Sequence, residues 1–558
     1  MPPYAYPHFE FRHCPELDGA RPRHSVAIAG GGPVGLTAAL QLATYGIRTV
    51  VFEDGDTVSE GSRALCWAKR SLEILDRFGV SERMVQKGYT WNAGRLFHGD
   101  SEVYRFNLQP QGQQKHPAFT NLQQYYAEEY LVAAVARQPL IELRWQSKVV
   151  NTSQDADKAV LTVETPAGTY KAEADYVIAA DGARSSVRRA LGLDFTGRVF
   201  EDHFLIADVD VHAELPSTDR RFWFHPSFHQ GETALCHKQG DNQWRVDFQL
   251  GWDIDVEAEK RPERALARVK AMLGDHPMDL TWVSIYTFQA RRLERLRHGR
   301  ILFAGDAAHQ VSPFGARGGN SGIQDADNLS WKLALVLQGK APDRLLDCYD
   351  SERGYAADEN IRITSRTTDF LTPKTPASRA FRDAVLQLAA EFPFARALVN
   401  SGRLSTPTIH AHSPLNTASE GFGSGVALGG PCPNLPVAAD FPSNRRVGFL
   451  LDVLGGGFQG LYFIDRESDI PPATAAALQA LCRAPLPVET FLVSRHAGAT
   501  TPFKNLIDAD GEIAMAFEAR PGTYYLLRPD QHVAARWRAL EPSALQTALD
   551  RAIGKLAA

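Results

Sequence analysis

A glycine-rich turn at residues 30–35 combines the residue types that bind a pyrophosphate. The sequence Gly-Gly-Gly-Pro-Val-Gly follows the short β-type run SVAIAG and opens the helical pattern PVGLTAALQLATYG. In such a turn the first glycine permits a tight bend, the second lets the backbone approach phosphate, and the third lets helix and strand pack closely. The helix N-terminus offers free N–H groups and a partial positive charge to the phosphates. The predicted dinucleotide-binding residues of this turn are Gly30, Gly32, Pro33, Val34 and Gly35.

An acidic residue stands where a dinucleotide site needs one. Glu53 ends the second strand-like run, TVVFED, about 20 residues beyond the glycines, and Asp54 follows it. A carboxylate at this place accepts hydrogen bonds from an adenosine ribose. The segment 455–460 has the same glycine spacing but precedes LYFIDRE, which is strand-like, so we interpret it as a turn.

Two further acidic residues follow predicted strands. Asp181 ends ADYVIAAD and precedes GARSSVR, and Asp306 ends GRILFAGD. The carboxyl ends of strands in an open α/β sheet face the ligand crevice, where an acid can hold cofactor hydroxyls and Arg184 or Arg188 could contact phosphate. Each acid taken alone is better explained as capping a helix, and it is their combination that favours a cofactor role.

The composition limits the class of protein. The 558 residues allow two to four domains, and 44% hydrophobic with 22% charged residues is ordinary globular usage. Lys and Arg total 60 against 65 Asp and Glu, a net charge of -5, which disfavours nucleic-acid binding. The six cysteines form no CxxC, which argues against a zinc ribbon or a disulfide scaffold, so we expect no metal. Without a signal-peptide pattern or a long apolar run, we expect a cytoplasmic protein with no membrane segment.

Three motifs together resemble the signatures of FAD-dependent aromatic-ring hydroxylases, the para-hydroxybenzoate hydroxylase and phenol hydroxylase group. They are GGGPVG with Glu53, DGARSSVR, and GDAAHQVSPFGARGGNSGIQDADNLSWKLA, in the same order and spacing over about residues 25–370. The tail, PCPNLP followed by VGFLLDVLGGGFQGLYFI, resembles the thioredoxin-like C-terminal domain of the longer members.

The resemblance implies an α/β fold in which a Rossmann-like FAD-binding domain is interleaved with a β-sheet substrate domain and followed by a thioredoxin-like domain. Residues 196–290, which alternate polar and aromatic residues as antiparallel strands do, fit the substrate sheet. The predicted parts are an N-terminal arm (1–24), the FAD-binding domain (25–195 and 291–370), the substrate-binding sheet domain (196–290), a helical segment and linker (371–424), and the thioredoxin-like domain (425–558).

The resemblance also assigns cofactor roles by position. It implies that Glu53 holds the adenosine ribose, that Arg63 lies near the pyrophosphate, and that Gln124 contacts the ribityl side of the flavin. Asp306 would bind a ribityl hydroxyl, and Asp181 with Arg184 belongs to a motif linked to both FAD and the nicotinamide. The remaining predicted cofactor residues are Gly305, Pro313, Gly318, Gly319 and Asn320, the last three at the start of a helix whose N-terminus would stabilise negative charge on reduced flavin.

The chain departs from the family in the loop at 313–320. The usual P-x-x-G-Q-G-x-N reads Pro-Phe-Gly-Ala-Arg-Gly-Gly-Asn here, so Ala316 replaces a glycine and Arg317 a glutamine. Arg317 could strengthen an anion site, point at a substrate carboxylate, or lie on the surface of a permissive turn. The departure affects the substrate assignment more than flavin binding.

The implied reaction is hydroxylation of a phenolic ring through a flavin C4a-hydroperoxide, with NADH or NADPH as transient hydride donor and O2 as oxidant. A phenol is more nucleophilic after it loses its proton, so a base or proton relay should face the pocket. The predicted catalytic residues are Pro313, Arg291, Tyr286 and His225, with Arg292 and His237 as further candidates; a satisfied polar or surface role stays open for each. We interpret His309 as structural, and His410 and His412 as surface residues rather than metal ligands.

Other functions remain as alternatives. A hydroxylase or Baeyer–Villiger-type oxygenase of a polycyclic or polyketide quinone, and a flavin oxidase without oxygen insertion, would use the same scaffold. A flavin-dependent halogenase is disfavoured because Gly251-Trp252-Asp253-Ile254 lacks the second Trp and the Pro of that group's motif. A dehydrogenase without flavin would leave Asp181 and Asp306 without a purpose, and a non-enzymatic nucleotide-binding module would not consume NAD(P)H. A homodimer is possible.

Overall fold

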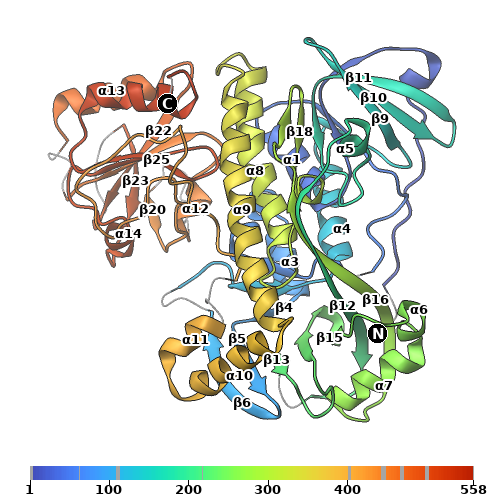
Figure 1. Ribbon diagram of the computed structural model, residues 1–558. Helices are drawn as coiled ribbons and strands as arrows, with labels where there is room; N and C mark the ends of the chain where they lie inside the picture. Colours follow the sequence, from blue (N-terminus) through green and yellow to red (C-terminus); the bar gives the residue numbers. More distant parts are fainter. Residues whose placement is uncertain are drawn as a thin grey trace.

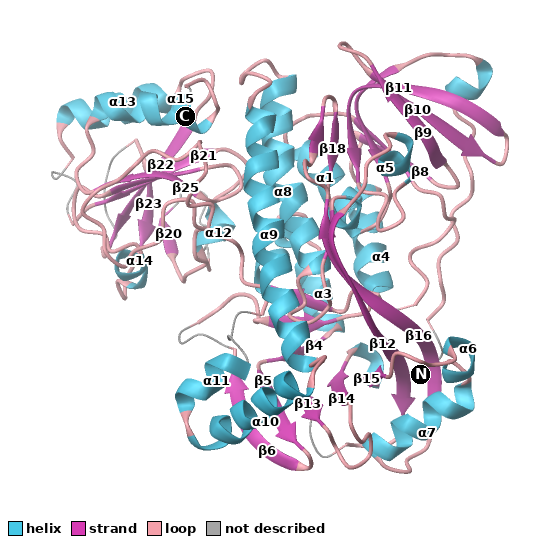
Figure 2. Ribbon diagram, in the orientation of Figure 1, coloured by secondary structure: helices cyan, strands magenta, loops and turns pink. Residues whose placement is uncertain are grey.

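The computed structural model describes residues 4–61, 63–108, 113–215, 218–399, 404–440, 448–465, 470–496 and 502–556. Three bodies are visible: an upper α/β body, a lower sheet body, and a C-terminal body beside two long central helices (Figures 1 and 2). Along these ranges, no helix combines the length and the apolar character needed to cross a bilayer.

The upper body is built on a sheet with a parallel centre. Its order is β17-β18-β11-β1-β2-β8; β10 pairs antiparallel with β11, and β9 pairs antiparallel with β10. The near-continuous apolar runs of the central strands fit burial on both faces. The strands are β1 (Arg23–Ala29), β2 (Thr49–Phe52), β8 (Ile141–Arg144), β9 (Lys148–Gln154), β10 (Ala159–Thr165), β11 (Gly168–Ala179), β17 (Arg297–His298) and β18 (Ile301–Phe303).

Helices cover this sheet and carry a small second sheet. A three-stranded sheet, β3 (Cys66–Ala68), β7 (Phe119–Asn121) and β4 (Tyr89–Trp91), joins the upper body to the lower one. The helices are α1 (Pro33–Thr44), α2 (Lys69–Asp76), α3 (Ser81–Lys87), α4 (Gln124–Val135), α5 (Ser186–Ala190), α8 (Gly318–Leu337) and α9 (Leu345–Leu371).

The lower body is a mostly antiparallel sheet of order β19-β16-β12-β15-β14-β13-β5-β6. β12 begins at Thr196, the predicted start of the substrate domain, but β5 and β6 come from the segment that sequence analysis placed inside the FAD-binding domain. One face packs on α7, and α10 and α11 lie beside the β6 edge (Figure 1). The elements are β5 (Ala93–His98), β6 (Ser101–Asn107), β12 (Thr196–Val211), β13 (Arg220–Phe224), β14 (Thr233–Lys238), β15 (Gln243–Leu250), β16 (Met278–Arg292), β19 (His309–Gln310), α6 (Val256–Glu259), α7 (Pro262–Leu273), α10 (Pro376–Glu391) and α11 (Pro393–Val399).

The C-terminal body is a six-stranded sheet of order β20-β23-β22-β21-β24-β25. The glycines at 455–457 lead directly into β21, so this segment precedes a strand, as predicted. Its elements are β20 (Ala438–Asp440), β21 (Phe458–Phe463), β22 (Val488–Ser494), β23 (Lys504–Ile507), β24 (Tyr524–Leu527), β25 (Val533–Trp537), α12 (Leu450–Val453), α13 (Pro472–Cys482), α14 (Glu512–Ala516) and α15 (Pro542–Ala552).

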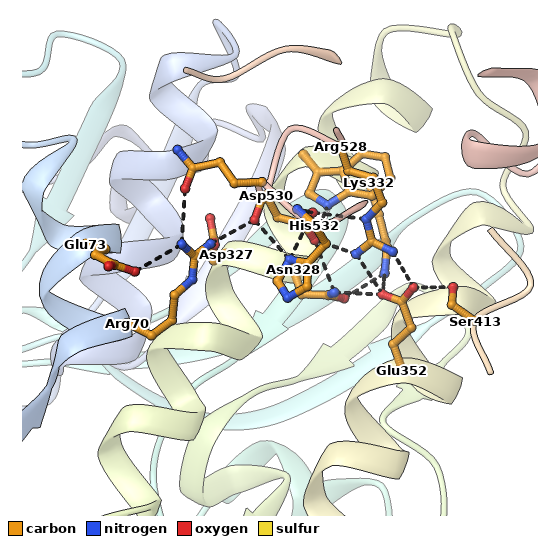
Figure 3. A network of polar contacts seen from close by, with 12 residues as sticks. Arg70, Glu73, Asp327, Asn328, Lys332, Glu352, Ser413, Arg528, Asp530 and His532 are labelled. Atoms are coloured by element: carbon orange, nitrogen blue, oxygen red, sulfur yellow. Dashed lines mark hydrogen bonds and ion pairs between the residues drawn. The ribbon is translucent and has the colours of Figure 1, made fainter. Parts of the chain in front are cut away.

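A buried ionic network joins the C-terminal body to the central helices (Figure 3). Arg528 donates to Glu352 of α9 and to Asp530, and Lys332 of α8 donates to Glu352 at 2.6 Å. His410, which sequence analysis placed on the surface, is buried, and its ring lies 5.1 Å from that of His532 beside this network. The surface prediction for His410 is wrong because residues 404–417 fold back between α9 and the C-terminal body; His412 is exposed, as predicted.

Candidate functional site

The turn between β1 and α1 accepts only glycine at two positions. Gly30 has φ +100°, and a Cβ there would lie 2.4 Å from the carbonyl oxygen of Ala180; a Cβ on Gly35 would lie 2.0 Å from that of Gly30. At Gly32, in contrast, the nearest described atom to a Cβ is Glu128 Oε1 at 4.0 Å. The turn therefore packs tightly on the sheet side and leaves room on the other, which fits a pyrophosphate at the helix N-terminus.

Glu53 closes this turn at the end of β2. Gly31 N–H donates to Glu53 Oε2 at 2.6 Å and Gly55 N–H to Oε1 at 3.1 Å. Burial, followed by the neighbouring Asp54, raises the pKa of Glu53 to about 7. The carboxylate is fixed beside the glycine turn, as ribose binding requires, and the exposed Asp54 lines an adjacent groove of about 420 Å³.

Gln124 organises the loop that carries Arg63. Its Oε1 accepts from Ala64 N–H at 2.8 Å, and its Nε2 donates to Glu128 Oε1 at 2.7 Å and to Ser59 Oγ at 3.1 Å. Arg63 is exposed at the mouth of this loop. Gln124 thus shapes the loop through protein contacts. Glu128, which is buried one helical turn further along α4, lies in no motif that would have identified it from the sequence.

Asp181 caps a helix with one carboxylate oxygen, and its cofactor role stays a prediction. Its Oδ2 accepts from the N–H groups of Ser186 at 2.7 Å and Val187 at 3.1 Å, which caps α5. Its Oδ1 is buried with no hydrogen-bond partner among the described residues and is free for a ligand hydroxyl. Arg184 is exposed, whereas Arg188 donates to two backbone carbonyls and is structural.

The turn at 305–309 rests on α1 and α8. Gly305 has φ +61°, and a Cβ there would lie 3.0 Å from Val34 Cγ2. Asp306 is exposed to solvent, yet the surrounding protein raises its pKa by desolvation. Both observations fit a carboxylate that solvent reaches amid closely packed surroundings, as expected for binding a ribityl hydroxyl.

A buried triad locks this turn. Asp325 of α8 accepts from Gly305 N–H at 3.0 Å, His309 Nε2 at 2.7 Å and Arg353 Nε at 2.6 Å. The nearby cations hold the pKa of Asp325 below its usual range against the opposing effect of burial. His309 is therefore in a structural position, as interpreted from the sequence.

The loop at 313–320 joins the cofactor side to the lower sheet. Pro313 is exposed, while the ring of Phe314 packs 5.3 Å from that of Phe204. Asn320 Oδ1 accepts from Ala68 N–H at 2.9 Å and its Nδ2 donates to Cys66 O at 2.8 Å, so it pins β3 to the start of α8. α8 begins at Gly318, and Gly318 and Gly319 keep its N-terminus open.

The two departures from the family pattern have distinct consequences. Ala316 has φ +53°, the left-handed region that favours the glycine usually found there. Arg317 is buried and donates from Nη1 to Asn360 Oδ1 of α9 at 2.7 Å. The alternative that Arg317 is a surface residue is therefore wrong, because the packing of α8 against α9 buries it.

The predicted catalytic residues do not gather at one point. Tyr286 is half-buried on β16, where its ring lies 6.1 Å from that of Trp282. Arg291 donates to Gln310 of β19 at 3.2 Å, and His225 contacts Arg382 of α10. Arg291 and His225 each have a protein partner, which fits the alternative of a satisfied polar residue. The catalytic roles of all the predicted residues stay predictions.

The sequence reasoning missed a polar cluster on one face of the lower sheet. Arg245 and Asp247 alternate along β15 with Trp244 and Val246, which point into the core beneath α7. The Arg245 guanidinium binds Asp208 and donates from Nη1 to Arg63 O at 3.3 Å. This face is therefore turned toward the upper body, which carries the predicted FAD-binding residues and is called the cofactor body below. The two-residue period of QWRVDFQL was the signal that could have separated the two faces.

Comparison with known proteins identifies relatives over most of the chain. The model of the family described as "FAD binding domain" matches residues 23–364. A 3-(3-hydroxy-phenyl)propionate/3-hydroxycinnamic acid hydroxylase of Mycolicibacterium smegmatis is 27% identical over 94% of this chain and 92% of its own. A 12-dehydrotetracycline 5-monooxygenase/anhydrotetracycline 6-monooxygenase of Streptomyces rimosus is 33% identical over 66% of this chain and 73% of its own.

Solved structures agree in fold. The p-nitrophenol 4-monooxygenase of Pseudomonas putida superposes with a TM-score of 0.62 at 28% identity, over 70% of this chain and 100% of that one. The flavin-dependent monooxygenase PieE, solved with FAD and substrate, gives a TM-score of 0.79 at 23% identity, over 96% of this chain and 100% of that one. The second likeness includes the C-terminal body.

Proposed function

The chain belongs to the FAD binding domain family and is an FAD-dependent aromatic hydroxylase, and on this premise we propose that it hydroxylates a phenol that carries a carboxylate group. The family match and the relatives confirm the predicted fold class, the FAD cofactor, the NAD(P)H-dependent monooxygenase class and the resemblance to aromatic-ring hydroxylases. The homodimer and the cytoplasmic location stay predictions.

The residues at the predicted cofactor site fit FAD. The tight turn at Gly30 with the open position at Gly32, and the unpartnered Asp181 Oδ1 among the described residues, supply what the cofactor needs. We assign Glu53 to the ribose and Asp306 to the ribityl chain, and the α8 N-terminus to negative charge on the ring system. When bound, FAD accepts hydride from NAD(P)H and activates O2 for transfer to the ring.

The chain itself orients the substrate and excludes water. Phe314 lies against the lower sheet, with ring centroids 5.4 Å from Phe288 and 6.5 Å from Phe222. This apolar wall beside Pro313 gives a flat ring a surface to pack on, next to the α8 N-terminus. Burial of an aromatic ring against such a wall is favourable and displaces water from the reacting carbon.

One observation of the structure supports a carboxylate group on the substrate. Arg220, at the start of β13, packs 5.3 Å from the Trp91 ring, and among the described residues no carboxylate forms an ion pair with it. A half-buried guanidinium with no carboxylate within ion-pair distance among the described residues can bind an anion. The relatives aligned along 94% of the chain are named as hydroxylases of 3-(3-hydroxy-phenyl)propionate, which supports a phenol with a carboxylate group as substrate.

The test is hydroxylation assayed with a matched pair of phenols. We expect a yellow protein whose NADH or NADPH oxidation in air rises with 3-(3-hydroxyphenyl)propionate and yields a product one oxygen atom heavier. Arg220→Met should raise KM for this probe about 10- to 100-fold, the worth of a charge-assisted hydrogen bond, and leave KM for 3-propylphenol unchanged. A colourless protein that FAD cannot reconstitute would refute the function, and equal KM changes for both phenols would refute the carboxylate.

A polycyclic substrate is the second candidate. The 33% identity to the tetracycline monooxygenase, over 66% of this chain, favours this candidate. Oxygen insertion into anhydrotetracycline, with no turnover of either small phenol, would select this candidate.

A further inference from the structure

We propose that Asp247, on the cofactor-facing side of the lower sheet, takes the proton of the substrate's ring hydroxyl. This inference rests on the proposed function and assigns the general base that the sequence left open. The O–H bond of the phenol breaks, the proton passes to a carboxylate oxygen of Asp247, and the electron pair stays on the ring oxygen. The phenolate activates the ring carbon for oxygen transfer.

Strand pairing places Asp247 in the middle of this face. Asp247 of β15 pairs with Ile206 of β12 and Leu235 of β14, and Leu235 pairs with Phe222 of β13. Paired residues in neighbouring strands point to the same face of a sheet. Asp247 thus stands in the same row as Phe222, whose ring faces Phe314 of the loop beside Pro313.

The next row is polar and touches the cofactor body. It holds Arg245 and His237, which pair across β15 and β14. Cys66 of β3 lies against this row, with its Sγ 4.0 Å from His237 Nδ1, and Arg245 reaches the carbonyl of Arg63. Asn320 at the start of α8 binds the Cys66 carbonyl. The face of the sheet that carries Asp247 therefore lies toward β3 and the loop at 313–320.

One carboxylate oxygen of Asp247 is available to accept a hydrogen bond from a bound molecule. Its Oδ1 is buried and has no hydrogen-bond partner within the part of the chain that the structure describes. Asp208, the other carboxylate of the cluster, is already bound by Arg245 through Nε at 2.8 Å and Nη2 at 2.9 Å. A buried carboxylate oxygen without a donor is costly and is satisfied by a donor on a bound molecule, here a ring hydroxyl.

The surrounding charges tune Asp247 as a base. The ionisable groups that face it are Arg245 on its own strand, Asp208 on β12, Arg220 on β13, and, across the cluster, His237 on β14 and Cys66 on β3. Burial raises the pKa of Asp247 to about 6 against the lowering effect of Arg245 and Arg220. It is therefore ionised at neutral pH and more basic than an ordinary aspartate.

His237 is the less suitable base. It is 4% exposed, and burial followed by Arg220 and Arg245 lowers its pKa well below 6.5. The ring is neutral and too weak to hold a proton at neutral pH. Its Nε2, which finds no partner among the described groups, suits a hydrogen bond to the phenolate or to a water instead.

The experiment compares Asp247→Asn with wild type in the holoenzyme. We expect kcat for 3-(3-hydroxyphenyl)propionate to fall about 100-fold or more, with the Kd of this probe within a few-fold. In wild type kcat should rise with pH through the pKa of Asp247 between pH 5 and 7; this limb should vanish in the variant. The ultraviolet difference spectrum of the bound probe should show phenolate at a higher pH in wild type than in Asp247→Asn, because the ionised carboxylate disfavours a second negative charge beside it.

A matched control uses the same sheet. Asp279→Asn on β16 removes an exposed carboxylate that pairs only with His212 in the described chain, and should leave all readouts unchanged. Asp247→Glu restores a carboxylate and should recover part of kcat and the pH limb. FAD absorbance and thermal melting establish that each variant is folded and loaded.

The outcomes separate the two proposals. A wild type that binds FAD but oxygenates no phenol overturns the proposed function and the role of Asp247 with it. A wild type that hydroxylates the probe, with Asp247→Asn keeping more than a third of kcat and the acidic limb, overturns the role of Asp247 alone.

Discussion

Removal of Arg528 tests the buried junction between the C-terminal body and the two central helices. Its side chain is 0% exposed and donates to Glu352 at 2.5 and 3.0 Å and to Asp530 at 3.0 and 2.5 Å (Figure 3). Arg528→Met leaves Glu352 paired with Lys332 at 2.6 Å, and Asp530 paired with His532 at 3.4 Å, among the described residues. Breaking a buried ion pair costs about 3–5 kcal/mol, and because one guanidinium serves both acids we expect the upper end of this range.

Denaturant unfolding combined with limited proteolysis measures this cost. We expect Arg528→Met to lower the urea midpoint and to expose the segment 404–424 to protease before the upper body unfolds. The triple variant Arg528→Met, Glu352→Gln, Asp530→Asn removes the stranded charges and should recover much of the loss. Arg23→Met, which breaks the surface ion pairs with Asp157 and Asp175, is the control and should leave the midpoint nearly unchanged.

The pH dependence follows from the same contacts. Opposite charges hold the pKa values of Glu352 and Asp530 well below their usual range against the effect of burial. A lowered pKa contributes stability that is present above the unfolded value near 4 and is lost as pH falls toward the folded value. Arg528→Met raises the pKa values of the two stranded carboxylates, so its loss of stability relative to wild type should be largest near neutral pH and should shrink as pH falls below about 4. An unchanged midpoint, or a triple variant no more stable than the single one, would refute this reasoning.

Three further variants test local features. Ala316→Gly should raise the free energy of unfolding by about 0.5 kcal/mol, since relief of a left-handed alanine exceeds the added chain entropy; a lower urea midpoint would contradict it. Gly30→Ala should abolish FAD retention, because its Cβ meets the Ala180 carbonyl, whereas Gly192→Ala, equally left-handed but with no described atom within 4 Å, should stay yellow. His410→Gln should lose less stability than wild type between pH 7 and 5.5, because burial holds the pKa of His410 well below the unfolded value of 6.5; parallel losses would contradict this.

The cofactor side was predictable because its chemistry is local in sequence. A strand, a glycine turn and a helix place Gly30, Gly35 and Glu53 with little help from the rest of the chain, and the structure puts them together. Asp181 shows the limit of this reasoning. Capping a helix and binding a hydroxyl both need a carboxylate after a strand, and only the structure shows that one oxygen caps α5 while the other has no partner among the described residues.

The substrate side was less predictable because its neighbours come from distant segments. Asp247 faces Cys66 and Arg220 only after β15, β14 and β13 pair and the sheet meets β3. The burial of Arg317 depends on Asn360, which lies in a different helix. Periodicity predicts which residues share a face, but not which body that face meets.

Helix α8 connects the proposed chemistry to the C-terminal body. Its first turn carries Asn320, which pins β3, and Asp325 in its second turn fixes the turn that bears Asp306. Further along, Trp331 donates to Asp530 at 3.1 Å and Lys332 to Glu352. Because a helix is rigid over this length, the contacts that seat the C-terminal body also set where the cofactor-binding end of α8 lies. The contacts of Trp331 and Lys332 therefore connect the C-terminal body to the helix whose N-terminus we assign to FAD.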